Sequence, residues 1–181
     1  DTHKSDKKEK ILATELNLSS KIKSCLVATA CLELSSQPLS DTLEQFAEIT
    51  AQAGLKTLRI LPLFLAPGVH VKEDIPAIIE QSQQKLSEKL NLDLCPYLGS
   101  NPLMSKLLAT RFENLATEAR ILVAHGSRRE NANQIIEAIA SELQATITYW
   151  SISPQLAEAV QELVRRGHKR IGIVPYFIFS G

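Results

Sequence analysis

Two short segments of this chain place a histidine beside other groups that could do chemistry. In the first, GVHVKEDIP, His70 follows a Pro-Gly break, and Glu73 and Asp74 come three and four residues later. An imidazole beside carboxylates can bind a first-row transition metal ion and can exchange protons near neutral pH. His70 is therefore a candidate metal ligand, and His70 and Glu73 are candidate bases. The alternative is a surface loop without chemistry, and under either reading we expect Asp74 to cap a helix that starts at Ile75.

In the second segment, AHGSRR, His125 comes directly after an apolar run. Gly126 could let a ligand approach the backbone closely, and Ser127 could cap the next helix, whose free N–H groups attract anions. With Arg128 beside them, these residues predict binding of a carboxylated or phosphorylated ligand, or of a metal through His125. The alternative is a structural loop in which His125 is hydrogen-bonded and Ser127 is only a cap.

Strands and helices are predicted to alternate along the chain. Apolar runs of strand length occupy residues 26–32, 57–65, 120–124, 146–150 and 170–179, and helical spacing of apolar residues marks 39–53, 75–89, 133–143 and 155–166. This alternation predicts an α/β fold, in which helices cover both faces of parallel sheet. Both histidine segments follow a strand, so we expect them in loops at the carboxyl edge of a sheet. Tyr149 and Trp150, which end one run, are expected in the core.

The composition excludes several classes of function. Lys and Arg number 20, as do Asp and Glu, so the net charge is zero, and there is no basic stripe of the kind that binds nucleic acid. No Walker or G-x-G-x-x-G motif is present. The three cysteines lack C-x-x-C spacing, which indicates reduced thiols. No apolar run is long enough to cross a bilayer, so we expect a soluble cytoplasmic protein without a membrane partner.

An internal repeat divides the chain. RILPLFLAPG, ending at Gly68, aligns with GIVPYFIFSG, ending at Gly181; the offset is 113 for the prolines (175 − 62) and for the glycines that end the preceding helices (167 − 54). This predicts two similar units, residues 1–118 and 119–181. The second unit opens with a strand and an HGS turn that the first lacks, and it ends where the first continues into GVHVKEDIP. We therefore expect a fragment, or the ordered part, of a longer protein.

Five segments together resemble the sirohydrochlorin chelatase family of the CbiX/SirB type, in its long form with two units in one chain: CLEL, PLFLAPGVHVKEDIP, LCPYLGSNP, ILVAHGSRR and IVPYFIFSG. The resemblance implies a chelatase-like α/β fold of two similar lobes. It also implies insertion of Co2+ or Fe2+ into the tetrapyrrole sirohydrochlorin, in cobalamin or siroheme biosynthesis. The metal would be a substrate, no organic cofactor is expected, and the protein would be a monomer or a homodimer.

The resemblance also suggests roles for individual residues. In that family the histidine of the first HGS turn and the histidine of the G-x-H segment bind the metal and accept the pyrrole protons. His70 matches the second of these, whereas His125 matches an HGS histidine of the second unit. His70 and Glu73 would then be catalytic, His70 and His125 would bind metal, and Gly126, Ser127 and Arg128 would bind substrate. Because the first HGS turn is missing, a tetrapyrrole-binding or metal-binding module without catalysis stays the alternative.

Overall fold

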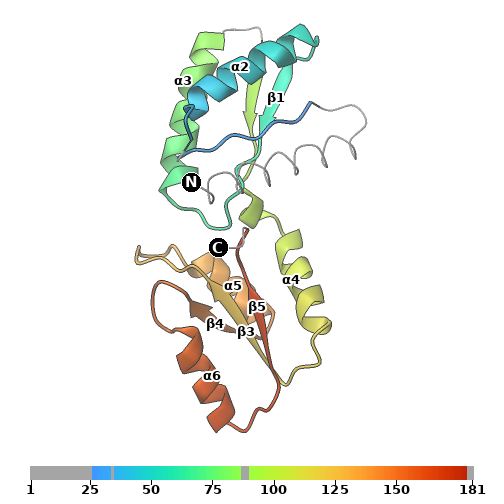
Figure 1. Cartoon of the computed structure of the whole chain (residues 1–181), viewed down its shortest axis with the longest axis vertical. Helices are drawn as coiled ribbons and strands as arrows, with labels where there is room; N and C mark the ends of the chain where they lie inside the picture. The colour runs from blue at the N-terminus through green and yellow to red at the C-terminus, as the bar shows by residue number, and fades with distance from the viewer. Residues whose placement is uncertain (1–25, 34, 87–89, 179–181) are drawn as a thin grey trace. The chain divides into compact units, whose positions relative to one another are not determined.

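The computed structural model describes residues 26–33, 35–86 and 90–178 (Figure 1). Contacts divide the chain into two compact units, which we call unit 1 (residues 1–60 and 74–94) and unit 2 (residues 61–73 and 95–181). These compact units do not coincide with the division at residue 118 that the repeat predicts, because residues 61–73 and 95–118 pack with the second sheet rather than with the first. The division of the sequence into two repeats stays a prediction.

In its described residues, unit 1 contains a two-stranded parallel sheet and two helices. Strand β1 (Thr57–Ile60) pairs with β2 (Asn91–Leu94), while α2 (Leu39–Gln52) contacts β1 and α3 (Ile75–Leu86) contacts β2. Helix α2 ends as the sequence predicts, because Gly54 adopts a positive φ of 75° and donates its N–H to the Ala51 carbonyl.

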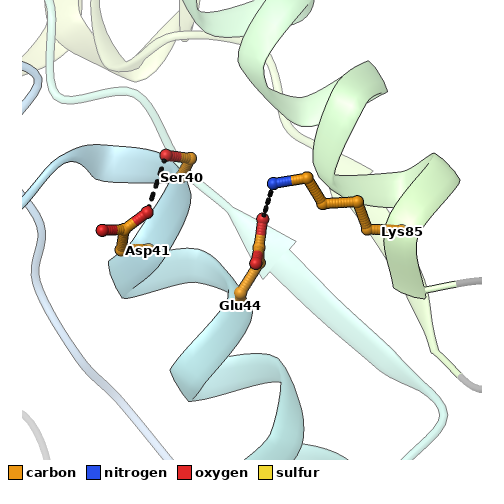
Figure 2. A network of polar contacts seen from close by, with 4 residues as sticks. All are labelled: Ser40, Asp41, Glu44 and Lys85. Carbon is orange, nitrogen blue, oxygen red and sulfur yellow. Dashed lines mark hydrogen bonds and ion pairs between the residues drawn. The ribbon is translucent and has the colours of Figure 1, made fainter.

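Helices α2 and α3 contact each other and are joined at their surface by an ion pair (Figure 2). The Lys85 ammonium lies 2.6 Å from Glu44 Oε1, and on α2 the Ser40 hydroxyl donates to Asp41 Oδ1 at 3.2 Å. The hydrogen bond to Glu44 raises the pKa of Lys85. Among the described residues of this unit, the buried apolar side chains come from both helices, from β2 and from the residue before β2: Leu43, Ala47, Ile75, Ile79, Leu90 and Leu92.

Unit 2 is a three-stranded parallel sheet in the order β4-β3-β5. Its elements run in chain order as the helical turn η3 (Leu98–Ser100), α4 (Leu103–Glu113), β3 (Ala119–Ala124), α5 (Gln134–Glu142), β4 (Thr146–Tyr149), α6 (Leu156–Arg165) and β5 (Ile171–Pro175). Another helical turn, η1 (His70–Asp74), lies where the chain passes into α3. Parallel strands joined by helices confirm the predicted α/β fold.

Helices cover both faces of the unit 2 sheet. On one face, Leu122 and Val174 of the sheet pack in one cluster with Phe112 of α4 and Ile139 of α5. On the other face, α6 supplies the buried residues of a cluster with β3. Strand β3 is therefore buried on both sides, which explains its continuous apolar sequence.

One predicted strand is wrong, and two others are shorter than expected. Residues 26–32 form no strand in the described part of the chain, and Leu26 is 46% exposed. The reason is that an apolar segment forms a strand only where another strand is available to pair with it. Strand β1 ends at Ile60, just before Pro62, which has no N–H to donate. Strand β5 ends at Pro175.

The sequence analysis also missed two elements, the short strand β2 and helix α4. Within the described ranges, no helix is both long and apolar enough to span a membrane.

Candidate functional site

The segment that leads from β1 toward His70 lies against the turn η3. The N–H of Leu98 donates to the Pro62 carbonyl at 3.0 Å, and the N–H of Gly99 donates to the Phe64 carbonyl at 2.9 Å. A β-carbon at Gly99 would lie 2.1 Å from the Leu65 carbonyl oxygen, so only glycine fits there. The sequence analysis missed this role; its signal is the glycine of LCPYLGSNP.

His70 is the first residue of the turn η1, which runs directly into α3. The N–H groups of Val71 and Lys72 both donate to the Gly68 carbonyl, at 3.2 and 3.1 Å, so helical hydrogen bonding begins immediately after the Pro-Gly break. The expectation that His70 lies in a loop and that Asp74 caps the following helix is therefore wrong. Asp74 is inside the helical segment, and the wide turn is tolerated there because Pro76 has no N–H to leave unsatisfied.

The imidazole of His70 is half-buried and packs against an aromatic ring. Its centroid lies 5.9 Å from that of Phe64, with the two planes tilted by 43°. Glu73, in the same turn, is exposed. An imidazole held against a ring and a carboxylate open to solvent can together take up a proton and release it to water. The catalytic roles of His70 and Glu73 stay predictions.

The loop after β3 holds His125, Gly126, Ser127 and Arg128, and an asparagine closes it. The N–H of Ser127 donates to Asn133 Oδ1 at 3.0 Å, and Asn133 Nδ2 donates to the Ser127 carbonyl at 2.8 Å. Helix α5 starts only at Gln134, so Ser127 is not its cap, and that expectation is wrong. Because Asn133 binds both backbone groups of Ser127, it closes the loop in place of the cap.

Gly126 serves internal packing. Its φ is +81°, and a β-carbon there would lie 2.8 Å from the Tyr149 Cβ and 2.9 Å from Ile152. The Tyr149 hydroxyl donates to Glu137 Oε1 at 3.0 Å. Burial, together with this hydrogen bond, raises the pKa of Tyr149. The glycine therefore lets the loop pack on the end of β4, and its role toward a ligand stays a prediction.

His125 and Trp150 are both exposed and lie at the ends of neighbouring strands. The N–H of Trp150 donates to the Ala124 carbonyl at 2.9 Å, and the N–H of Ser151 donates to the His125 carbonyl at 3.0 Å. Trp150 is 74% exposed, so its expected place in the core is wrong, whereas Tyr149, at 4%, is in the core as predicted. The reason is alternation: the residue after a strand's buried side chain points to the other face.

The structure thus arranges the predicted site residues as two groups. His70 and Glu73 share one helical turn, and His125, Gly126, Ser127 and Arg128 share one loop. Within the part of the chain that the structure describes, no three or more His, Cys, Asp or Glu side chains form a group that could hold a metal ion. Metal binding by His70 and His125 stays a prediction.

Parallel sheets flanked by helices define an α/β protein, a class that carries its ligand sites beyond the carboxyl ends of its strands, and His125 lies directly after such an end. The chain belongs to the CbiX family, whose profile matches residues 2–115 and 119–181.

Two curated relatives carry chelatase names. A sirohydrochlorin cobaltochelatase of Priestia megaterium is 27% identical over 174 residues, which cover 87% of this chain and 55% of that protein. A sirohydrochlorin ferrochelatase of the same organism is 25% identical over 155 residues, which cover 78% of this chain and 58% of the relative. The chain therefore spans a little over half the length of each of these relatives.

Solved structures share the fold. SirB from Bacillus subtilis with Fe3+ superposes with a TM-score of 0.75 at 22% identity, covering 97% of this chain and 73% of that one. CbiX, described as the terminal enzyme for biosynthesis of siroheme in denitrifying bacteria, has a TM-score of 0.53 at 25% identity and covers 67% of this chain and 56% of its own. The predicted chelatase-like α/β architecture is confirmed.

Proposed function

We propose that this chain is a sirohydrochlorin chelatase, which inserts Co2+ or Fe2+ into the macrocycle in cobalamin or siroheme biosynthesis. The observation that carries the proposal is the match of the CbiX family profile over residues 2–115 and 119–181. The names of the two curated relatives, one a cobaltochelatase and one a ferrochelatase, support both metals. Imidazole and carboxylate ligands suit either ion, so the residues do not select between them.

His70 and Glu73 are the proposed catalytic residues. Insertion of a divalent ion releases two pyrrole N–H protons, so the reaction needs a base close to the ring. The half-buried imidazole of His70, oriented by the Phe64 ring, would bind the incoming metal and accept protons. The exposed carboxylate of Glu73 would then pass protons to water. A site with so few ligands also lets the metal leave, which a closed site of four thiolates would prevent.

Gly126, Ser127 and Arg128 are proposed to bind the substrate. Sirohydrochlorin carries eight carboxylates, which pair well with exposed guanidinium groups. Arg128 is exposed, and in the described ranges its side chain has no carboxylate partner. We propose a cytoplasmic location, because Fe2+ persists only in a reducing compartment. We propose a monomer or a homodimer.

We also propose that residues 1–118 and 119–181 are two copies of one ancestral unit. The family profile matches one stretch on each side of this boundary. In addition, the two glycines that the repeat aligns, Gly54 and Gly167, both adopt positive φ, at 75° and 92°.

The test of the proposed function is anaerobic insertion. The chain is incubated with sirohydrochlorin and Co2+, or with Fe2+, and the absorbance of the macrocycle is followed. We expect a rate above that of the uncatalysed reaction, lowered at least about 100-fold in His70→Ala because a general base and a metal ligand are lost together. His168→Ala, which removes another half-buried histidine of unit 2, is the matched control and should leave the rate unchanged. An equal rate in His70→Ala would exclude the proposed catalytic role.

A binding module without catalysis is the second candidate, favoured by one observation: the described residues contain no cluster of three or more potential metal ligands. This candidate predicts that the chain binds sirohydrochlorin or the metal ion without accelerating insertion. The same assay distinguishes the two candidates. If the macrocycle binds but is not metallated faster than in buffer, the chain is a binding module.

A further inference from the structure

A row of three exposed rings, those of His125, Trp150 and Phe177, lies at the carboxyl edge of the unit 2 sheet as the described residues define it. The strand register pairs Ala124 with Tyr149 and Val123 with Pro175. Continued past the strand ends, this register places His125 beside Trp150 on one side and beside Phe177 on the other. The bonds of the last pairs are in place, because the N–H of Trp150 donates to the Ala124 carbonyl at 2.9 Å and the N–H of Tyr176 to the Val123 carbonyl at 2.7 Å. The N–H of Ser151 also donates to the His125 carbonyl at 3.0 Å, which keeps the chain after β4 beside His125.

Alternation continued past the strand ends predicts that all three residues of this row lie on the α6 side of the sheet; His125 follows Ala124, which belongs to the core on the opposite side. Tyr149 and Tyr176 belong to the core on the opposite side, so alternation turns the following residues, Trp150 and Phe177, toward the α6 side. They are 74% and 43% exposed, and His125 is exposed between them. In the described residues, the core cluster on the α6 side includes Ile121 and Val123 but none of the three, so this ring row stays open.

The loop that follows His125 adds positive charge to the ring row. Arg128 and Arg129 are both exposed, and neither forms an ion pair in the described part of the chain. By contrast, Arg165 and Arg166 of the same unit are both paired with Glu162, at 2.6 and 2.8 Å. Glu130 follows the two arginines, which leaves the three adjacent side chains with a net charge of +1. An aromatic surface beside unpaired guanidinium groups is complementary to a flat ligand with carboxylates at its margin.

We propose that this ring row, together with Arg128 of the loop to which we assign substrate binding, forms a second site separate from the catalytic pair, and that it holds the metallated macrocycle after insertion. Trp150 and Phe177 contact the flat ring, His125 binds the chelated metal as an axial ligand, and Arg128 and Arg129 pair with the peripheral carboxylates. The identity of the macrocycle rests on the proposed function, but the site shares no residue with the proposed catalytic pair His70 and Glu73.

The imidazole is what selects the metallated form. A metal ion held in the plane of a tetrapyrrole keeps open axial positions, and imidazole is a common axial ligand there. The metal-free macrocycle offers His125 no such bond and would bind through ring contacts and charge alone. Ser151 fixes the position of His125, because both its N–H and its hydroxyl donate to the His125 carbonyl, at 3.0 and 2.8 Å.

The test uses preformed cobalt-sirohydrochlorin titrated anaerobically into the chain. Trp150 is the only tryptophan, so its fluorescence should be quenched on binding, and the absorption bands of the complex should shift as the imidazole binds. We expect His125→Ala to abolish the band shift. Trp150→Ala, followed by absorbance, and Phe177→Ala should each raise the dissociation constant about tenfold. Metal-free sirohydrochlorin should bind the wild-type chain and His125→Ala equally weakly.

The matched controls are exposed residues of α4, Leu103→Ala for lost apolar surface and Arg111→Ala for lost charge, neither of which should change binding. All the substituted side chains are exposed, so the variants should fold, which thermal unfolding verifies. A band shift that survives in His125→Ala, or affinity unchanged in both aromatic variants, would overturn the proposal. A third result would also overturn it: light scattering shows a dimer that Trp150→Ala dissociates, and the macrocycle does not bind. The ring row would then be an interface between two copies of the chain.

This outcome is separable from that of the proposed function. Cobalt insertion that depends on His70, without product binding through His125, would leave a chelatase with no second site. Product binding that depends on His125, without accelerated insertion, would support the second site and exclude the proposed catalytic activity.

Discussion

Gly126 packs against Tyr149 so closely that a β-carbon at position 126 would lie 2.8 Å from the Tyr149 Cβ. Tyr149 is itself anchored, because its hydroxyl donates to Glu137 Oε1 of α5 at 3.0 Å. The loop that carries His125 therefore packs on a buried side chain of β4. Substitution of either residue should therefore lower the stability of unit 2 and weaken any binding by the loop.

Replacing Gly126 with alanine should destabilise the fold. The methyl group would overlap Tyr149 and Ile152, and φ at +81° is strained for any side chain, so we expect the free energy of unfolding to fall by about 2–4 kcal/mol. Denaturant unfolding followed by circular dichroism measures the loss. Gly54→Ala is the control, because its φ of +75° is similar but no atom lies within 4 Å of the added carbon. It should cost only about 1 kcal/mol; equal losses in the two variants would show that contact with Tyr149 is unimportant.

Tyr149 should make stability fall at alkaline pH. Burial and the hydrogen bond to Glu137 raise its pKa above the usual 10.0 in the folded state. Below pH 10 the phenol is protonated in both states and the stabilisation is complete. At higher pH the unfolded chain loses this proton while the folded chain keeps it, so the free energy of unfolding falls by up to about 1.4 kcal/mol per pH unit.

Comparison with Tyr149→Phe isolates this contribution. The variant lacks the titrating group but keeps the buried ring, so its stability should decline less steeply above pH 10 than that of the wild-type chain. Denaturant unfolding at a series of pH values between neutral and strongly alkaline gives both slopes. Parallel slopes would show that Tyr149 titrates alike in the folded and unfolded chains.

Removing the Tyr176 hydroxyl should have the opposite effect on stability to removing that of Tyr149. The Tyr176 side chain is 4% exposed, and its hydroxyl has no hydrogen-bond partner in the described structure. Burial of this group raises the pKa of Tyr176. Because a buried hydroxyl without a partner is unfavourable, Tyr176→Phe should raise the free energy of unfolding by about 1 kcal/mol, whereas Tyr149→Phe should lower it by about the same amount at neutral pH. A loss in Tyr176→Phe would indicate a partner for the hydroxyl.

The sequence predicts best what depends on burial alone. Strand β3, at residues Ala119–Ala124, is apolar along its length because helices cover both of its faces, and it was predicted at nearly its full extent. Residues 26–32 have a similar composition but form no strand, since that requires a neighbouring ladder, which a local pattern does not report. For the same reason β2 was missed: its four residues carry a weak pattern and are fixed by pairing with β1.

The candidate site was harder to predict because its details depend on single contacts between distant residues. Trp150 is expected in the core because it ends an apolar run, but the last buried residue of that run is Tyr149, one position earlier. Ser127 was expected to cap a helix, but the loop is closed by Asn133, six residues later in the chain. The sequence therefore predicts that residues 125–128 follow a strand, but not the hydrogen bonds that close their loop.

Replacing Gly99 with alanine should disturb the segment before His70. A β-carbon at Gly99 would lie 2.1 Å from the Leu65 carbonyl oxygen and 2.6 Å from its Cα, and since these are backbone atoms no side-chain rotation relieves the overlap. The hydrogen bond from Gly99 to the Phe64 carbonyl would be lost as the two segments separate. Phe64 packs on the His70 imidazole, so its displacement should move that imidazole. We expect insertion of cobalt into sirohydrochlorin to slow at least about tenfold, since small misplacements of reacting groups are costly.

The control for this variant is Gly68→Ala, which adds a β-carbon to the same segment with no atom within 4 Å and no positive φ. It should retain the wild-type rate of insertion. Circular dichroism of both variants shows whether the folded state is kept, and saturating substrate separates a lower turnover from weaker binding. If Gly99→Ala folds and inserts cobalt as fast as Gly68→Ala, the packing of η3 against residues 61–65 does not position His70.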